Sequence, residues 1–335
     1  MINVQMLETE VAISFVKERF AEHLCQNLNL VKVSSPIAVL DGTGINDELN
    51  GVERPVSFPV KALGGQQAQV VHSLAKWKRI RLMDLGVERE KGIVTDMKAL
   101  RPDEEYTNLH SVYVDQWDWE KCMSESCRTL DYLKTAVNLI YKAMKCTEQE
   151  VYKAYPDIEP VLPENIKFIH SQELLDEYPL LTPKERERAA SIKHGAIFII
   201  GIGNKLSKGE PHDGRAPDYD DWSTLNEDGY YGLNGDIIVW HPTLECALEL
   251  SSMGVRVNRD SLMRQLSLKR CEEKAGLHFH KMLLSGMLPQ SIGGGIGQSR
   301  MCMFMLKKRH IGEVQVGIWS QEERVKMRET GVVLL

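Results

Sequence analysis

The feature that most restricts the fold is a series of strand-like runs that follow one another without a helix between each pair. These runs occupy 56–63, 67–74, 92–100 and 109–119, and the last contains the alternating segment 111–119. Alternation of apolar and polar residues is typical of a strand with one buried face. Because strands joined without crossover helices pair antiparallel, the sequence predicts an α+β fold with a mainly antiparallel β-sheet flanked by helices.

Helical periodicity marks the beginning of the chain. Apolar residues recur at helical spacing from Ile13 to Leu24, which predicts an amphipathic helix over 9–29. A strand is predicted at 30–39, and because Pro36 cannot donate to a ladder it should be an edge or interface strand. Further helices are predicted at 124–149 and about 183–194, and further strands at 166–172, 196–203, 234–241 and 247–257. The polar segment 204–229 is long enough for a functional loop.

Composition limits what the chain can bind. A net charge of −6 argues against a broad nucleic-acid surface. The 7 cysteines form no Cys-x-x-Cys pair. No stretch reaches the roughly 18 apolar residues of a membrane span, and the N-terminus does not resemble a secretory signal. We therefore expect a cytoplasmic protein with reduced thiols and with neither nucleic acid nor membrane as a partner.

A glycine-rich segment, Gly293-Gly-Gly-Ile-Gly-Gln-Ser-Arg300, precedes an apolar run that predicts a helix. Alternate glycines, as at 293, 295 and 297, leave one strand face bare, so that a flat ring or a phosphate can approach the backbone. Arg300 suits phosphate binding or stacking on a base. The segment has neither the P-loop lysine nor the third glycine of a dinucleotide fingerprint. It predicts a nucleotide site, with a glycine-rich turn before a buried helix as an equal alternative.

Cationic residues gather at two strand ends. Lys76, Lys78 and Arg79 lie at a strand-to-helix junction, where they oppose the helix dipole. They predict anion binding, with a solvated basic face as the alternative. Arg101 also ends a strand, and Asp103 after it could orient it toward a phosphate. A surface salt bridge is the alternative for this pair.

Carboxylates on other strands suggest further ligand contacts. Alternation puts Gln116 and Asp118 on one face, where they could bind the polar groups of an amino acid, although an exposed sheet face is equally compatible. Asp236 and Glu249 are predicted on neighbouring strands, with Ser251 on the face of Glu249. Two such carboxylates could hold Mg²⁺ together with phosphate oxygens. Pairing of each with lysine or arginine is the alternative.

In their order, these segments resemble the three motifs of the class II aminoacyl-tRNA synthetase catalytic core. The first motif, a long helix and a strand with a proline at the dimer interface, matches 9–36. The second, an arginine followed by an acidic residue after a strand, matches Arg101-Pro102-Asp103. The third matches Gly293 to Arg300, with Ser299 where that family usually has an acidic residue.

Roughly residues 13–320 resemble one offshoot of that core, ammonia-dependent asparagine synthetase (aspartate–ammonia ligase). The strings that carry the resemblance include His72-Ser-Leu-Ala-Lys-Trp-Lys-Arg79, Leu109-His-Ser-Val-Tyr-Val-Asp-Gln-Trp-Asp-Trp-Glu120, Arg215-Ala-Pro-Asp-Tyr-Asp-Asp-Trp222 and Glu249-Leu-Ser-Ser-Met-Gly254. The resemblance implies one catalytic domain, 1–335, that acts as a homodimer.

The implied reaction joins L-aspartate, ATP and ammonia through a β-aspartyl-adenylate to give L-asparagine, AMP and pyrophosphate. Because the first motif begins near residue 9, no anticodon-binding domain is expected around this core. Ile2 after Met1 offers no thiol or hydroxyl for a glutaminase, so free ammonia is the expected nitrogen donor.

The resemblance also implies roles for residues. Those expected to bind ATP are Arg101, at the α-phosphate, Gly295, Gly297 and Arg300, at the base or the γ-phosphate. Those expected to bind aspartate or its amino group are Ser73, Lys78, Gln116, Asp118, Asp220 and Ser251. Asp236 and Glu249 are expected to hold Mg²⁺. Asp47 is expected to bind ammonium or to accept its proton, as a catalytic residue beside Arg101 and Arg300.

Two other functions remain open for such a chain. One is a shortened synthetase relative that charges a tRNA or a protein lysine, and asparagine formation without tRNA would distinguish it. The other is a regulatory relative that only binds nucleotide. Both motif arginines and both proposed metal carboxylates are present, which argues against the regulatory alternative.

Overall fold

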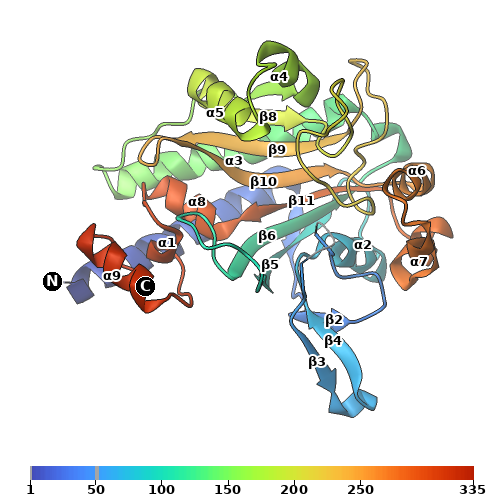
Figure 1. Ribbon diagram of the computed structural model, residues 1–335, viewed down its shortest axis with the longest axis horizontal. Helices are drawn as coiled ribbons and strands as arrows, with labels where there is room; N and C mark the ends of the chain where they lie inside the picture. Colours follow the sequence, from blue (N-terminus) through green and yellow to red (C-terminus); the bar gives the residue numbers. More distant parts are fainter. Residues whose placement is uncertain (1, 50–52) are drawn as a thin grey trace.

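The computed structural model describes residues 2–49 and 53–335 and contains one large β-sheet in the order β1-β5-β6-β11-β10-β9-β8-β7 (Figure 1). Its strands are β1 (Leu30–Lys32), β5 (Gly92–Leu100), β6 (Tyr113–Cys122), β7 (Lys167–His170), β8 (Ala196–Ile200), β9 (Asn234–His241), β10 (Cys246–Val255) and β11 (Ser291–Gly297). The inner strands, from β5 to β8, pair antiparallel, as predicted. The two edge strands do not: β1 pairs parallel with β5, and β7 pairs parallel with β8.

The sheet is therefore mixed, and the prediction of a mainly antiparallel sheet is right for its interior alone. Parallel neighbours need a long connection that returns the chain to the same end of the sheet. Between β7 and β8 this connection is formed by α4 (Ser171–Glu177) and α5 (Pro183–His194). Between β1 and β5 it contains α2 (Ala75–Asp84) and a smaller sheet.

The smaller sheet is antiparallel, in the order β2-β4-β3, and projects from the rest of the molecule (Figure 1). It consists of β2 (Ala38–Leu40), β3 (Ser57–Val60), which is followed by the short 3₁₀ helix η1 (Lys61–Leu63), and β4 (Gln66–Val70). The prediction of one strand at 30–39 is wrong, because β1 and β2 belong to different sheets and Pro36 lies between them. β1 is nevertheless an edge strand, as predicted for this segment.

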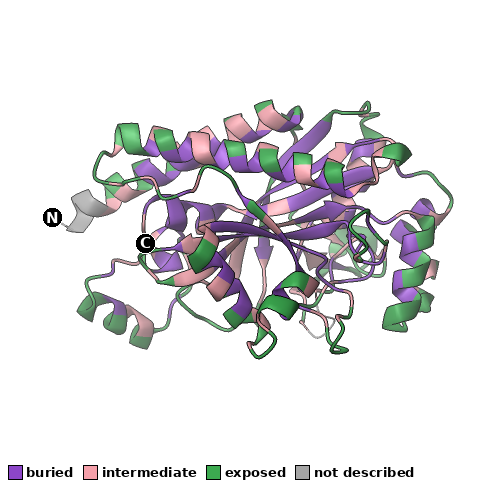
Figure 2. Cartoon of the chain, turned by 90° about the horizontal axis from the view of Figure 1, so that it is seen from above, coloured by how far each residue is buried: buried purple, intermediate pink, exposed green. Residues whose placement is uncertain are grey.

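Three helices cover one face of the large sheet: α1 (Ile2–Leu28), α3 (Leu130–Ala154) and α8 (Gln298–Met305). Figure 2 shows the buried strands and the long helices beside them, whose outer sides are exposed. Phe20 of α1 packs on Trp117 of β6 with ring centroids 4.6 Å apart, and Trp119 is also buried in this core. The predicted alternation of β6 is thus confirmed on this face.

The opposite face carries α2 against β5, β6 and β11, and α5 against β8, β9 and β10. The remaining helices are α6 (Arg259–Lys269), α7 (His278–Leu284) and α9 (Gln321–Glu329), with short 3₁₀ helices η2 (Glu125–Cys127), η3 (Glu272–Gly276) and η4 (Ile311–Glu313). Within the described ranges, no helix has the length and apolar character needed to span a bilayer. The face between α2 and α5 is where the predicted polar residues of β6, β10 and β11 meet.

Candidate active site

A cavity of about 560 Å³ lies on this face of the sheet, over β6, β10 and β11. The predicted site residues that line it are Asp47, Ser73, Lys78, Arg101, Gln116, Asp118, Asp220, Glu249, Ser251, Gly295, Gly297 and Arg300. Asp236 is not among the lining residues; its carboxylate is bonded by Arg215, which does line the cavity. The structure thus brings the predicted residues together, while their individual roles stay predictions.

The glycine face of β11 is less bare than predicted. A Cβ atom on Gly293 would lie 2.0 Å from Glu120 Oε2, and one on Gly295 would lie 2.3 Å from Gln116 Oε1. On Gly297 the nearest atom would be Arg300 Cβ at 3.5 Å, an ordinary contact. Gly293 and Gly295 therefore make room for side chains of this chain, and the expectation of an open face holds for Gly297. The segment is a strand followed by α8, not a turn.

Lys78 of α2 is fully buried and donates to the Asp118 carboxylate of β6. Its Nζ also donates to the Gly294 carbonyl oxygen at 2.8 Å. Burial lowers the pKa of Lys78, although Asp118 favours its charged form. Asp118 Oδ2 has no hydrogen-bond partner among the described residues, so one carboxylate oxygen is left for a ligand.

The other two cations of this basic group, Lys76 and Arg79, do not line the cavity. Lys76 is buried and pairs with Asp218 at 2.8 Å. Arg79 is buried and donates to the carbonyl oxygens of Val257 and Pro289 at 2.6 and 2.8 Å. The expectation of a solvated basic face is therefore wrong, and of these three cations Lys78 alone lines the cavity. Anion binding stays a prediction for Lys78.

Arg101 follows β5 and enters the cavity from the side of α2. Its Nη2 donates to the His72 carbonyl oxygen at 3.3 Å, while its Nε has no partner in the part of the chain that the structure describes. Asp103 does not orient it, as had been expected, because Asp103 binds Arg54, with Nε 3.0 Å from Oδ1. Arg101 thus keeps donors that no side-chain carboxylate occupies.

Arg300 of α8 is held by His110, a residue that sequence reasoning did not single out. Arg300 Nη2 donates to His110 Nε2 at 2.7 Å, and Nη1 donates to the Glu249 carbonyl oxygen at 3.2 Å. The His110 proton then lies on Nδ1, 2.8 Å from Thr107 Oγ1. Burial and the charge of Arg300 lower the pKa of His110 to about 4, which keeps this imidazole neutral. The signal that could have identified His110 was its position in the string 109–120, which carries part of the family resemblance.

Asp47 presents a buried carboxylate to the cavity, with 4% exposure. Its Oδ2 accepts a hydrogen bond from Ser73 Oγ at 2.8 Å, and its Oδ1 accepts one from the Leu49 amide at 2.9 Å. The two predicted residues Asp47 and Ser73 are therefore in direct contact.

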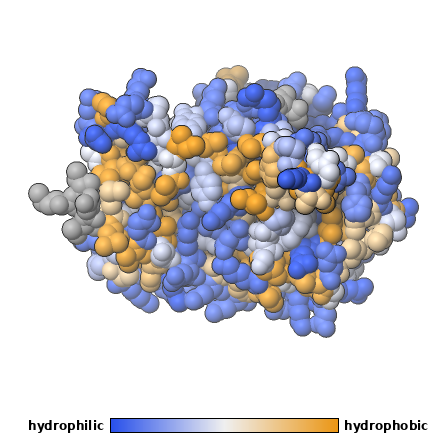
Figure 3. Space-filling model, turned by 90° about the horizontal axis from the view of Figure 1, so that it is seen from below, coloured by the Kyte–Doolittle hydropathy of each residue, from blue (hydrophilic) through white to orange (hydrophobic). Residues whose placement is uncertain are grey.

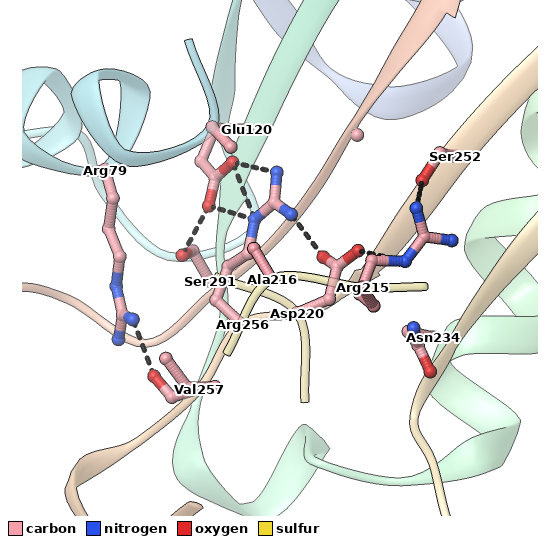
Figure 4. Close-up of polar contacts among 12 residues, drawn as sticks. Arg79, Glu120, Arg215, Ala216, Asp220, Asn234, Ser252, Arg256, Val257 and Ser291 are labelled. Atoms are coloured by element: carbon pink, nitrogen blue, oxygen red, sulfur yellow. Dashed lines mark hydrogen bonds and ion pairs between the residues drawn. The ribbon is translucent and has the colours of Figure 1, made fainter. Parts of the chain in front are cut away.

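A second buried ionic group surrounds Arg256, which sequence reasoning also missed although it directly follows β10 (Figure 4). Arg256 donates to Glu120 at 2.9 and 3.0 Å and to Asp220, and Ser291 Oγ donates to Glu120 at 2.7 Å. Burial raises the pKa of Asp220 in spite of Arg256 and Arg215. Burial acts likewise on Glu120, but Arg256 and Lys78 outweigh it and lower the pKa of Glu120. Asp220 therefore lines the cavity with a carboxylate that is already paired with Arg256.

The predicted Mg²⁺ carboxylates lie on neighbouring strands, Asp236 on β9 and Glu249 on β10. Arg215 Nη2 donates to Asp236 Oδ1 at 2.6 Å, so pairing with an arginine, the alternative reading, holds for Asp236. Burial and the charge of Glu249 raise the pKa of Asp236 to about 7, against the effect of Arg215. The register shifts between Glu249 and Ser251, so simple alternation fails there, although both residues line the cavity.

Ser299 of α8, which replaces the usual acidic residue of the third motif, contacts a carboxylate of β6. Its amide and its Oγ both donate to Asp115 Oδ1, at 2.9 and 2.6 Å. Lys17 of α1 pairs with the other oxygen of Asp115 at 2.9 Å. The start of α8 is thereby fixed to β6, which positions Arg300 in the next place along the helix.

Solved structures show the class of this fold. Asparaginyl-tRNA synthetase from Pyrococcus horikoshii, complexed with asparaginyl-adenylate, matches with a TM-score of 0.67 and 16% identity over 92% of this chain and 68% of that chain. Asparaginyl-tRNA synthetase from Entamoeba histolytica matches with a TM-score of 0.64 and 15% identity, over 93% and 67%. The fold is that of a class II aminoacyl-tRNA synthetase-like core.

Sequence comparison defines the family within that class. The family model for aspartate–ammonia ligase matches residues 7–331. The aspartate–ammonia ligase of Parabacteroides distasonis is 57% identical over 332 residues, which cover 99% of this chain and 96% of that protein. That of Clostridium perfringens is 52% identical with the same coverage. The chain belongs to the aspartate–ammonia ligase family, enzymes that make asparagine from aspartate and ammonia, and the predicted family is confirmed.

Proposed function

We propose that the chain makes L-asparagine in two steps through a β-aspartyl-adenylate, with ATP as the activating substrate. In the first step a β-carboxylate oxygen attacks the α-phosphorus, and pyrophosphate leaves. In the second step the lone pair of ammonia attacks the carbonyl carbon, the nitrogen loses a proton, and AMP leaves with the bonding electrons. Activation is needed because a carboxylate resists attack by a neutral amine.

The observation that carries this proposal is one cavity that holds both motif arginines and a buried lysine–carboxylate pair. Displacement at the α-phosphorus develops charge that fixed cations must stabilise. Arg101, whose Nε is free of partners among the described residues, is suited to this task. Arg300, held by His110, is assigned to the base or the γ-phosphate, and the open side of Gly297 leaves room for the nucleotide.

Aspartate is assigned to the part of the cavity around Lys78. The ammonium group of Lys78 would hold a carboxylate of aspartate, while Asp118 and Asp220 would receive its amino group. Asp118 Oδ2 and Ser251 Oγ lack partners within the described ranges, which leaves both atoms for the substrate. The remaining contacts are assigned to Ser73 and Gln116.

Asp47 is proposed to bind ammonium and to take its proton. Its carboxylate is buried at the cavity wall, where a cation finds a strong partner, and Ser73 fixes the position of Oδ2. A base must lie within hydrogen-bond reach of the nitrogen as it attacks the adenylate. Asp47 and the aspartate-binding group line the same cavity, which supports this role.

The residues present fit Mg²⁺ bound together with ATP. Asp236 and Glu249 are near enough for Glu249 to raise the pKa of Asp236, and no described residue bonds the Glu249 carboxylate. Residues 2–49 and 53–335 contain no cluster of three or more His, Cys, Asp or Glu that could hold a metal alone. Asp236 and Glu249 would therefore share the ion with phosphate oxygens, as Mg²⁺ prefers. Bound there, Mg²⁺ would neutralise phosphate charge.

We also propose that the enzyme is a homodimer. Apolar side chains are exposed on the first motif and on either side of it: Leu7 and Val11 on α1, Val31 on β1, and Ile37 after β1, at 58 to 67% exposure. Figure 3 shows apolar surface beside the start of the chain. Exposed apolar patches of this kind mark association surfaces. Light scattering of dilute protein should give twice the chain mass, and a fully active monomer would contradict the proposal.

An isotope experiment tests the chemistry directly. Aspartate labelled with heavy oxygen in its β-carboxylate is incubated with ATP and ammonium, and the products are separated by mass spectrometry. One labelled oxygen should appear in AMP, because the attacking oxygen stays on phosphorus when ammonia displaces AMP. Formation of ADP, or label in inorganic phosphate instead of AMP, would refute the adenylate. Omission of tRNA should change nothing.

A further inference from the structure

Arg215 links the loop between β8 and β9 to a carboxylate proposed for Mg²⁺. Its Nη2 donates to Asp236 Oδ1 at 2.6 Å, and its Nη1 donates to Ser252 Oγ at 2.7 Å. Its Nε has no hydrogen-bond partner in the described structure, and Asp220 Oδ2 lies 3.9 Å away (Figure 4). The side chain is 12% exposed and lines the cavity, so a ligand there can reach its guanidinium.

Arg215 lies near more carboxyl groups than it bonds. Asp236 and Glu249 place two carboxyl groups on adjacent strands, and Arg215 bonds that of Asp236. No described residue bonds the other. A divalent ion bound by both carboxylates would lie within a few ångströms of the guanidinium, where like charges repel strongly in a partly buried site. Arg215 therefore opposes a metal ion that arrives alone.

A polyphosphate reverses this balance. If a metal ion takes over Asp236, the largely buried guanidinium loses its bonded carboxylate and keeps only Asp220, which lies 3.9 Å away and is already bonded by Arg256; this is unfavourable. Phosphate oxygens supply a new partner, since the planar guanidinium suits phosphate as well as carboxylate. The exchange would use a new side-chain rotamer of Arg215 on a loop whose following residues are held in place: Asp221 N donates to Val255 O at 2.9 Å, and Trp222 Nε1 donates to Ala216 O at 3.0 Å.

We infer that Arg215 is an exchangeable counter-cation: it occupies Asp236 in the enzyme without nucleotide and moves to the phosphates when ATP and the metal enter together. The inference rests on the proposed use of ATP with Mg²⁺. It assigns to Arg215 the coupling between the two ligands, so that each binds weakly alone and strengthens the other by the same factor. Arg215 would then touch the substrate's phosphates during the first step.

Mn²⁺, counted as free ion by electron paramagnetic resonance, serves as the probe for the full-length enzyme with and without a non-hydrolysable ATP analogue. Without nucleotide, Arg215→Gln should bind Mn²⁺ at least about tenfold more tightly than the wild type, because a unit charge beside the ion is gone. The tightening of Mn²⁺ binding by the analogue, large in the wild type, should shrink in this variant. Arg215→Lys keeps the charge and should bind Mn²⁺ without nucleotide nearly as weakly as the wild type.

Arg89→Gln is the matched control, since Arg89 is exposed and does not line the cavity; its Mn²⁺ binding should equal that of the wild type. Equal Mn²⁺ affinities of Arg215→Gln and wild type would overturn the inference, as would a wild type whose Mn²⁺ affinity ignores the analogue. Should Arg215→Gln fail to fold, Ser252→Ala replaces it: loss of the Nη1 bond should tighten Mn²⁺ binding by a smaller factor, and an unchanged affinity again overturns the inference. A wild type that forms no AMP, while the Mn²⁺ differences appear, refutes the proposed function and leaves the counter-cation role standing.

Discussion

Replacement of Gly293 by alanine should destabilise the enzyme far more than the same replacement of Gly297 on the same strand. A Cβ on Gly293 would lie 2.0 Å from Glu120 Oε2 and 2.6 Å from Glu120 Cδ, so the carboxylate would have to move. The nearest atom to a Cβ on Gly297 lies at 3.5 Å. Both residues have strand or near-strand backbone, so the comparison isolates what lies above each glycine.

The expected size of the effect follows from the bonds that Glu120 would lose. This carboxylate has 0% exposure and accepts hydrogen bonds from Arg256, at 2.9 and 3.0 Å, and from Ser291, at 2.7 Å. Breaking a buried ion pair costs roughly 3–5 kcal/mol, because the remaining charge is left unpaired. For Gly297→Ala the change in unfolding free energy should stay within about 0.5 kcal/mol.

Urea unfolding, followed by tryptophan fluorescence and circular dichroism, measures both variants. Similar stabilities of the two variants would refute the view that Gly293 makes room for a buried ion pair. Gly297→Ala offers a second result from the same protein preparations. If the nucleotide lies against Gly297, the KM of the Gly297→Ala variant for ATP should rise although the stability of the variant does not change.

Three further outcomes are expected. Arg101→Ala should lower kcat roughly 10²-fold, as for loss of one oxyanion donor, whereas Arg300→Ala should mainly raise the KM for ATP; near-normal aspartate-dependent AMP formation by Arg101→Ala would contradict the assignment. With a pKa of about 4 in place of 6.5, native His110 binds fewer protons than the unfolded chain between these pH values. The stability that neutral His110 contributes is therefore fully present above pH 6.5 and is lost as the pH falls to 4. In urea unfolding without nucleotide, the unfolding free energy of the His110→Gln variant should lack this fall between pH 6.5 and 4, which should amount to roughly 1–2 kcal/mol after screening by solvent. Ammonium should support asparagine synthesis and ammonia-free glutamine should barely do so; comparable rates would contradict the nitrogen assignment.

The accuracy of the sequence-based elements followed the strength of their local signals. α5 has the bounds that were predicted for it, about 183–194; in the structure Thr182 caps it, Pro183 stands at its first position and Gly195 ends it. α3 was predicted over 124–149, too early at both ends, because the cap that starts the helix is Thr129 and the segment before it forms η2. Local signals could not show the parallel edge pairs, because pairing partners of β1 and β7 come from distant segments.

The difference between local signals and contacts of distant segments also explains which site residues could be predicted from the sequence. Alternation along one strand is visible in the sequence, so Gln116 and Asp118 were placed on the cavity face correctly. The group around Arg256 depends on the register between strands, which puts Glu120 opposite Gly293 and brings Asp220 from a loop. Register is fixed by packing of the whole sheet, and no pattern within one segment contains it.

Several cations that line the cavity are paired with carboxylates of the same chain. Lys78 pairs with Asp118, Arg215 with Asp236, and Arg256 with Glu120 and Asp220. When a substrate carboxylate or phosphate binds one of these cations, it does not have to remove a hydration shell from the cation. It replaces the carboxylate that the cation already contacts, or binds beside it. The desolvation of these side chains then takes place during folding, when each pair forms, whereas the ligand still loses its own water when it binds. Pairs with a free oxygen or nitrogen, such as Asp118 Oδ2 and Arg215 Nε, can add a ligand without losing the first partner. Such a site favours ligands of mixed charge, such as the amino acid and the metal-bound nucleotide proposed above, over a simple anion or cation of the same size.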